Sequence, residues 1–195
     1  FGYAEAVGAH ARVVRRALEP HLGKELVFDT WHRGEPLEKS AAPRPNVLAL
    51  QIVNWFGGRG GHIGFSPVMP PEGTVALEQF HRMKARFEQF GLDYYTSFTM
   101  GQRHINNVNL ILYNRDDAAM VANARALFRT LVADARERGY GEYRTHLDFM
   151  QDVADSYDFN DHALGRLNTR VKDLLDPNGI LAPGKNGIWP RAYRR

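Results

Sequence analysis

The hydrophobic period changes from helical to strand-like and back within residues 77–139, and this order limits the possible folds. Apolar residues at helical spacing predict one helix, whose apolar face consists of Leu77, Phe80, Met83, Phe87 and Phe90. The helix is expected to end at Gly91, because glycine often closes helices in a left-handed cap. Two runs rich in β-branched and aromatic residues follow, at about 93–100 and 104–113. A further amphipathic helix then runs to Gly139.

The flanking regions add two helices and one strand to this prediction. Apolar residues at helical spacing predict a first helix that ends near Pro20 and a last helix over 164–174. The run 47–53 has the composition of a strand, and the glycines at 57–61 predict a wide turn, although glycines also let a backbone pass close to a planar ligand. The resulting order predicts an α+β domain, with an antiparallel sheet that carries helices on one side.

Composition excludes several classes of function. The 195 residues are 44% hydrophobic, which is typical of one compact globular unit. The net charge is only +3 and the arginines are scattered, so we predict no nucleic-acid face. The chain has no cysteine, which excludes disulfides and thiolate metal sites, and we predict no metal. The longest apolar runs are too short to cross a membrane, and a reducing cytoplasm is the expected location.

Tyr143 and Arg144 place a phenol and a guanidinium side by side in the stretch 141–147, Gly-Glu-Tyr-Arg-Thr-His-Leu. A guanidinium is always charged and donates several hydrogen bonds, and a phenol adds an acidic donor. The pair is therefore suited to hold a substrate as an oxyanion. The alternative is an ordinary surface ion pair of Arg144 with Glu142 or Asp148.

Three further strings accompany this one, at 60–67 (Gly-Gly-His-Ile-Gly-Phe-Ser-Pro), 175–185 (Leu-Asp-Pro-Asn-Gly-Ile-Leu-Ala-Pro-Gly-Lys) and 187–190 (Gly-Ile-Trp-Pro). Together they resemble the C-terminal part of the vanillyl-alcohol oxidase and p-cresol methylhydroxylase family of flavoenzymes, most closely its bacterial eugenol oxidases. The resemblance implies FAD-dependent oxidation of para-substituted phenols, such as eugenol or vanillyl alcohol. In the mechanism that the resemblance implies, hydride passes from the para-benzylic carbon to the flavin and leaves a quinone methide, and the reduced flavin then reduces O2 to hydrogen peroxide. It also implies a homodimer.

The resemblance assigns roles to individual residues. His62 matches the histidine that is joined covalently to the flavin 8α-methyl group; the alternative is a histidine at a strand edge that is satisfied by backbone. Tyr143 and Arg144 match the pair that binds the phenolate oxygen. Lys185 matches a tail beside the flavin, where a positive charge favours reduction; the alternative is a solvated lysine in a glycine turn.

Four positions are candidates for the substrate pocket. Fungal vanillyl-alcohol oxidases carry a bulky aromatic residue at the position of Gly64, so glycine there implies room for longer para-substituents. Asn106 and Asn107 take the place of histidines in those enzymes; the alternative is hydrogen bonding within the sheet. Tyr94 is a candidate for the aromatic wall of the pocket, or a core residue of the same sheet.

The resemblance also divides the chain into a substrate or cap domain, residues 1–139, and a segment that returns to the FAD-binding domain, residues 140–195. The N-terminal FAD-binding half of the family has no counterpart here, so we expect these residues alone neither to bind FAD tightly nor to turn over. The cytochrome-coupled relatives tether flavin through a tyrosine, so His62 favours an oxidase over such a dehydrogenase. A third possibility is a non-catalytic fragment that acts as an assembly module.

Overall fold

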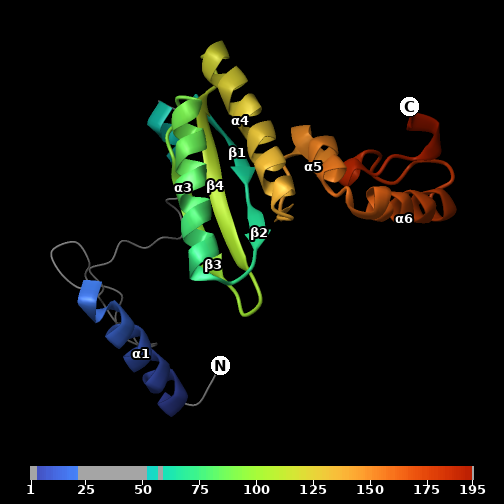
Figure 1. Ribbon diagram of the computed structural model, residues 1–195. Coiled ribbons are helices and arrows are strands. Elements are labelled where there is room, and N and C mark those ends of the chain that lie inside the picture. The colour runs from blue at the N-terminus through green and yellow to red at the C-terminus, as the bar shows by residue number, and fades with distance from the viewer. Residues whose placement is uncertain (1–3, 22–51, 57–58, 195) are drawn as a thin grey trace. The chain divides into compact units, whose positions relative to one another are not determined.

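The computed structural model of the chain describes residues 4–21, 52–56 and 59–194. The chain forms two compact units, Phe1–Leu50 and Gln51–Arg195, where composition predicts a single one. In the first unit the helix α1, Ala4–Leu18, confirms the predicted first helix (Figure 1). The elements described below belong to the second unit. None of the described helices is both long and apolar enough to cross a membrane.

Strand β4 is the centre of a five-stranded antiparallel sheet (Figure 1). β3 pairs along one edge of β4, and β1 followed by β2 pairs along the other. Phe65 lies opposite Asn109 and Val68 opposite Asn106, so β2 continues the register of β1 after a break at Ser66. β5 pairs with β2. The strands are β1 Gly60–Phe65, β2 Pro67–Met69, β3 Tyr95–Met100, β4 Ile105–Asn114 and β5 Gly141–Glu142.

Helices α3 and α4 cover one face of this sheet and enclose the main core, which confirms the predicted α+β class (Figure 1). Ile63 and Phe65 of β1 meet Phe87 of α3 and Phe128 of α4 in this core. Burial of each such aromatic side chain contributes about 1.5–3 kcal/mol. α3, β3, β4 and α4 all form where the sequence predicts them. The helices are α3 Gly73–Gln89, α4 Ala118–Glu137, α5 Met150–Ser156 and α6 Phe159–Leu175.

Local chemistry explains where the core helices start and stop. The side chain of Asp117 accepts the backbone N–H groups of Ala119 and Met120, both at 3.0 Å, and so caps the start of α4. Gly91 follows α3 with a φ of 66°, the left-handed conformation that the sequence predicts for it.

The predicted strand at 47–53 is wrong where it can be checked. Residues 47–51 lie outside the described part, and Ile52–Phe56 forms a 3-10 helix. The strand is β1 instead, which includes Gly60 and Gly61 of the predicted wide turn. A Cβ atom at Gly60 would overlap the carbonyl oxygen of Val53, and one at Gly61 would overlap the ring of Tyr113. These two glycines therefore permit close packing within a strand, and no turn forms there.

After the sheet the chain continues into α5, α6 and an extended tail. α6 confirms the predicted last helix with longer bounds. Its second to fourth residues, Asn160, Asp161 and His162, are left-handed, with φ of 47°, 54° and 57°. The turn after α6 is held by Asp176, whose carboxylate accepts the N–H groups of Ile180 and Leu181.

Candidate functional site

His62, Gly64 and Asn106 lie on the face of the sheet opposite to the one that α3 and α4 cover. His62 is opposite Leu112 and Gly64 is opposite Leu110 across the pair of β1 and β4. Opposed residues of an antiparallel pair share a face, and their neighbours along each strand point into the helix-covered core. We call this surface, made of His62, Gly64, Asn106, Leu110 and Leu112, the His62 face.

The His62 face has free space and a free hydrogen-bond acceptor. A Cβ atom at Gly64 would meet no heavy atom within 4 Å. Leu110 and Leu112 form a small apolar cluster with Ile52. Oδ1 of Asn106 is buried and has no hydrogen-bond partner in the described part of the chain. Since most buried polar atoms are paired, an apolar surface with one free acceptor fits an aromatic ligand that carries a donor.

The imidazole of His62 is exposed and forms no hydrogen bond with a described residue. Packing around the ring lowers its pKa, and electrostatic interactions with His146, Arg115 and Arg144 lower it further. A neutral imidazole keeps a lone pair on one nitrogen, which is the form that acts as a nucleophile. The described chain therefore provides no backbone partner of the kind that a purely structural histidine would have.

Strand β5 brings Tyr143 and Arg144 to the edge of the sheet. The N–H of Tyr143 donates to the carbonyl oxygen of Ser66 at 3.0 Å, next to the break between β1 and β2. Both side chains are exposed, that of Tyr143 by 66%. The guanidinium of Arg144 forms no ion pair with a described residue, because Asp148 pairs with Arg125 at 2.7 Å instead. A cation without a carboxylate partner is available to an anionic ligand.

Glu142 is the buried acid beside this pair, only 9% exposed. Its carboxylate accepts the N–H of Ser66 at 2.7 Å and the N–H of Arg144 at 3.2 Å. Burial raises its pKa to about 7, although the two N–H donors and the charge of Arg144 act in the opposite direction. Perturbed carboxyl groups of this kind are frequent at functional sites. The sequence suggests only a surface partner of Arg144 at this position, because neighbouring residue types do not reveal burial.

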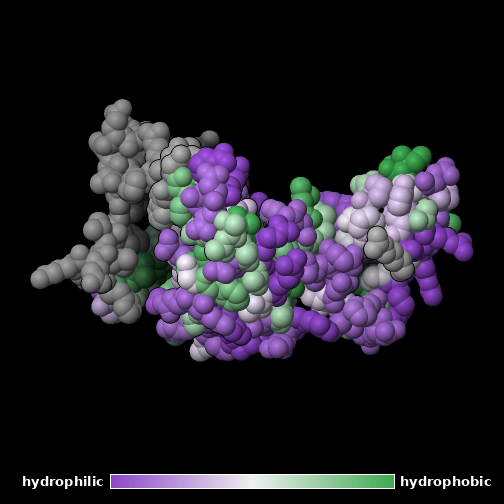
Figure 2. Space-filling view, turned by 90° about the horizontal axis from the view of Figure 1, so that it is seen from above, coloured by the Kyte–Doolittle hydropathy of each residue, from purple (hydrophilic) through white to green (hydrophobic). Residues whose placement is uncertain are grey.

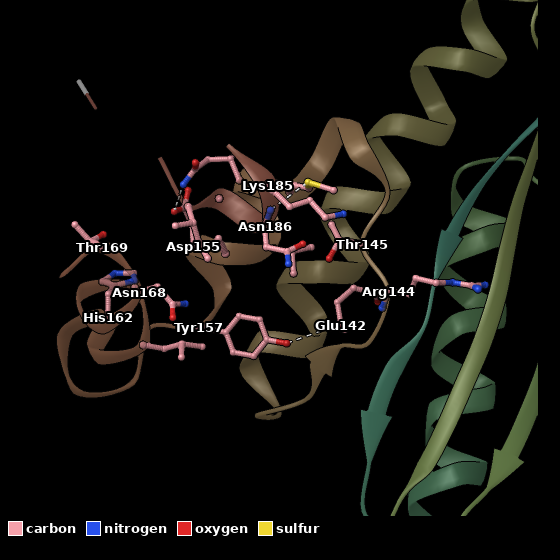
Figure 3. A pocket seen from close by; sticks show the side chains of 18 of the residues that line it. Glu142, Arg144, Thr145, Asp155, Tyr157, His162, Asn168, Thr169, Lys185 and Asn186 are labelled. Atoms are coloured by element: carbon pink, nitrogen blue, oxygen red, sulfur yellow. Dashed lines mark hydrogen bonds between the residues drawn. The ribbon is translucent and has the colours of Figure 1, made fainter. Parts of the chain in front are cut away.

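A cavity of about 740 Å³ opens beside Tyr143 and Arg144 and reaches residues of α5, α6 and the tail (Figure 3). Tyr143, Arg144 and Lys185 all line it. In Figure 3 the side chain of Arg144 extends away from the α6 residues and towards the strands, while Tyr157 points towards Glu142. Cavities of this size hold small organic ligands.

The wall of the cavity is anchored to α4 by ion pairs and by one aromatic ring. Three arginines of α4 pair with three aspartates of the following segment: Arg125 with Asp148 at 2.7 Å, Arg129 with Asp152 at 3.4 Å, and Arg136 with Asp158. The ring of Phe149 is fully buried and stacks on Phe128, with centroids 4.2 Å apart. The cavity wall is thus joined to the core that supports the sheet.

Two of the predicted pocket positions lie away from the His62 face. Tyr94 packs against Phe80 and Phe87 of α3, with ring centroids 5.6 Å and 5.1 Å away. Asn107 is buried on the helix-covered face and donates to Oγ1 of Thr96 at 2.7 Å, so it does hydrogen-bond within the sheet. The structure thus collects Tyr143, Arg144 and Lys185 at the cavity and His62, Gly64 and Asn106 on the sheet, and it places Tyr94 with neither.

His146 and Tyr157 are polar groups of this region that the sequence did not single out. Nδ1 of His146 accepts the N–H of Asp148 at 3.2 Å, and His146 interacts electrostatically with His62. The hydroxyl of Tyr157 donates to the carbonyl oxygen of Glu142 at 3.2 Å. His146 belongs to the same string as Tyr143, which could have identified it, whereas Tyr157 has no such signal. Within the described ranges, no group of three or more His, Cys, Asp or Glu could hold a metal ion.

Comparison with known proteins identifies one family and several relatives. The family model of FAD linked oxidases, C-terminal domain, matches residues 5–186. The 4-cresol dehydrogenase (hydroxylating) flavoprotein subunit of Pseudomonas putida is 34% identical over 193 residues. This match covers 96% of the present chain but 36% of that subunit, so the chain spans well under half of the relative's length.

Two solved structures share the fold of the chain. A 4-ethylphenol oxidase from Gulosibacter chungangensis, in its isoeugenol complex, has a TM-score of 0.72 and 39% identity, over 77% of this chain and 28% of that one. A p-cresol methylhydroxylase with substrate bound has a TM-score of 0.76 and 28% identity, over 97% of this chain and 37% of that one.

Proposed function

The chain belongs to the family of FAD linked oxidases, C-terminal domain, and from this premise we propose that it holds the substrate in a flavin-dependent oxidase of para-substituted phenols. The similar proteins are named for 4-cresol, also called p-cresol, and for 4-ethylphenol, and both compounds carry a hydroxyl group and a para substituent. Because the chain covers at most 37% of these proteins, we assign the activity to a longer polypeptide that includes it.

One observation carries this proposal: Arg144 has no carboxylate partner among the described residues, although it lies beside Tyr143 on a ligand-sized cavity. Its charge also acts on His62. A free phenol has a pKa of about 10 and is neutral at physiological pH. A cation and a hydrogen-bond donor next to its oxygen lower that pKa and favour the phenolate.

In the proposed mechanism Tyr143 and Arg144 bind the substrate oxygen as a phenolate. The negative charge promotes loss of hydride from the para-benzylic carbon of the substrate, which becomes a quinone methide. FAD, when bound, supplies the two-electron oxidation, and O2 is then reduced to hydrogen peroxide. Lys185 adds a second positive charge at the same cavity.

We further propose that His62 is the covalent attachment point of the cofactor. The neutral imidazole favoured by its lowered pKa has the lone pair that such a bond requires. The open space at Gly64 and the unpaired Oδ1 of Asn106 lie on the same face and fit a planar ring with a hydrogen-bond donor. A covalent bond to the flavin ring would change the electronic properties of the cofactor, which is one way in which a protein tunes its oxidising power.

The test uses the full-length natural polypeptide that contains these residues. Denaturing mass spectrometry with peptide mapping is expected to find the mass of one FAD on the peptide with His62. Incubation with 4-ethylphenol in air is expected to produce hydrogen peroxide. His62→Ala should abolish the added mass, whereas His104→Ala, at an exposed histidine just before β4, should keep it. A protein that neither carries flavin nor oxidises phenols contradicts the proposal.

A dehydrogenase that passes its electrons to another protein is the second candidate. The relative in Pseudomonas putida is named a dehydrogenase, and its match covers 96% of the chain, which supports this second candidate. The two candidates differ in the reoxidation of the reduced flavin. An oxidase reoxidises in air within its turnover time, whereas a dehydrogenase turns over rapidly only with an artificial electron acceptor.

A further inference from the structure

Glu142 is a buried carboxylate to which the proposed function gives no role. We propose that Glu142 is a positioning residue, whose carboxylate holds the Tyr143–Arg144 pair against the break that follows the His62 strand. This inference rests on the proposed function, since it concerns the geometry of the phenolate-binding pair. Glu142 itself is not assigned any contact with the substrate.

Three hydrogen bonds define this clamp. The N–H of Ser66 donates to Oε2 of Glu142 at 2.7 Å, and the N–H of Arg144 donates to Oε1 at 3.2 Å. The N–H of Tyr143 donates in turn to the carbonyl oxygen of Ser66 at 3.0 Å. Ser66, the residue that follows β1, is therefore hydrogen-bonded through both its N–H and its carbonyl oxygen to the segment that carries Tyr143 and Arg144. Two oxygens of one side chain connect the strand of His62 to the backbone of Arg144.

The chemistry of the clamp requires a carboxylate. Pro67 follows Ser66 and has no N–H, so it cannot contribute a donor to the pairing of β2 with β5. An ionised carboxylate offers an acceptor oxygen to each of two N–H groups, and such charge-assisted bonds are stronger than neutral ones. A glutamine has the same shape but presents an NH2 group to one of the two donors. Glu142→Gln therefore removes one bond of the clamp with little change of volume.

The surroundings of Glu142 make the clamp sensitive to pH. The positive charge of Arg144 acts on the carboxylate of Glu142. Tyr157, at the C-terminal end of α5, is a second titratable group that interacts with it. Burial outweighs the effect of Arg144 and raises the pKa of Glu142 to about 7. Protonation converts one acceptor oxygen into a donor, so the clamp weakens as the pH falls through this value.

The experiment compares wild type, Glu142→Gln and the exposed control Glu137→Gln in the full-length polypeptide. The dissociation constant of 4-ethylphenol is measured from about pH 6 to about pH 9, with the flavin mass on His62 as a check of integrity. Glu142→Gln is expected to weaken binding about tenfold at the alkaline end, as for loss of one charge-assisted hydrogen bond. The dissociation constants of Glu142→Gln and wild type should become equal at the acid end of the pH range. Glu137→Gln should match wild type throughout.

Each failure has a distinct signature. If wild type oxidises phenols and Glu142→Gln keeps wild-type affinity at every pH, the clamp is wrong and the proposed function stands. If wild type binds no phenol, the proposed function fails and the inference fails with it. If Glu142→Gln does not fold, amide hydrogen exchange of the wild-type protein tests the clamp instead. After correction for intrinsic rates, Ser66 and Arg144 should lose protection below about pH 7 while Tyr143 keeps it, and equal behaviour of the three overturns the clamp.

Discussion

The sheet layer, residues 60–140, and the C-terminal segment, residues 147–194, both contain regular apolar patterns, but the sheet layer encloses most of its apolar residues and the C-terminal segment leaves most of its own exposed. Phe65, Phe87 and Phe128 have no exposed surface. α6 buries none of its residues and leaves Leu174 79% exposed. Figure 2 shows strongly hydrophobic atoms at the surface of the C-terminal segment. Apolar periodicity therefore predicts that a helix forms, and does not tell whether the described chain covers its apolar face.

The candidate site draws on both regions. His62, Gly64 and Asn106 belong to the layer that packs around its own core. Lys185 belongs to the C-terminal segment, which is joined to α4 through ion pairs and through Phe149. The sheet layer therefore provides most of the buried core, whereas both regions contribute residues to the candidate site. Substitutions in the two regions should differ accordingly in their effect on stability.

The largest contrast is expected between an aromatic residue of the core and a leucine of α6. Phe128→Ala should lower the free energy of unfolding by about 3–5 kcal/mol, because it removes the contacts with Phe65 and Phe149 and leaves a cavity. Leu174→Ala should change it by about 0.5 kcal/mol or less, as for other exposed positions. Chemical denaturation of the chain measures both. Equal losses would show that α6 is packed as tightly as the sheet layer.

The second effect concerns pH and lies at the junction of the two regions. Glu142 has a pKa of about 7 in the folded protein and an ordinary value of 4.5, so between these values the folded state keeps a proton that the unfolded chain loses. The free energy of unfolding should therefore fall as pH rises across this interval, by up to about 3 kcal/mol. Denaturation of wild type and Glu142→Gln at matched pH isolates the contribution of Glu142 to this pH dependence. Parallel pH profiles of the two proteins would contradict the assigned burial.

A smaller effect is expected at the start of α6. Asn160 is the first of three consecutive residues with positive φ, a conformation that glycine adopts without steric cost. Asn160→Gly should therefore stabilise this turn by up to about 1 kcal/mol. Hydrogen exchange of the first α6 amides reports the change, and Asn168→Gly, within the regular part of the helix, is the control that should destabilise. Destabilisation by both substitutions would argue against the left-handed start.

The smallest effect is expected in the ion pairs between α4 and the C-terminal segment. Asp152 lies 3.4 Å from Arg129, and both side chains are partly exposed. Asp152→Asn should lower the free energy of unfolding by about 0.5 kcal/mol or less, and the loss should diminish at high salt. Thermal unfolding at two ionic strengths measures it. A loss comparable to that of Phe128→Ala would place the connection among the main sources of stability.

In the sheet layer, the sequence predicted the elements with a regular apolar pattern, but it missed the strand that contains glycines. α3, β3, β4 and α4 follow from apolar period and turn residues alone. β1 was missed because Gly60 and Gly61 indicate a turn locally, whereas in the fold they permit close approach to Val53 and Tyr113. That requirement arises from residues distant in sequence. The division of the chain near residue 50 was likewise not visible in composition.

The site was predictable only where a string of residues carried it. Tyr143, Arg144 and Lys185 were identified from their strings, and the structure places them on one cavity. The role of Glu142 depends on burial and on two backbone donors, neither of which appears in the order of residues. The roles given to all the candidate residues stay predictions: Tyr143, Arg144, Lys185, His62, Gly64, Tyr94 and Asn106.

The ionisation state of a bound phenol tests most directly whether Tyr143 and Arg144 hold an oxyanion. Ultraviolet difference spectra of 4-ethylphenol bound to the full-length polypeptide should show phenolate at about pH 7, although the free phenol has a pKa of about 10. Arg144→Met should return the bound phenol to its protonated form, whereas Arg115→Met, which also removes a charge acting on His62, should leave the phenolate. A phenol that stays protonated on the wild type, with an unchanged titration in Arg144→Met, would contradict the proposed role of the pair.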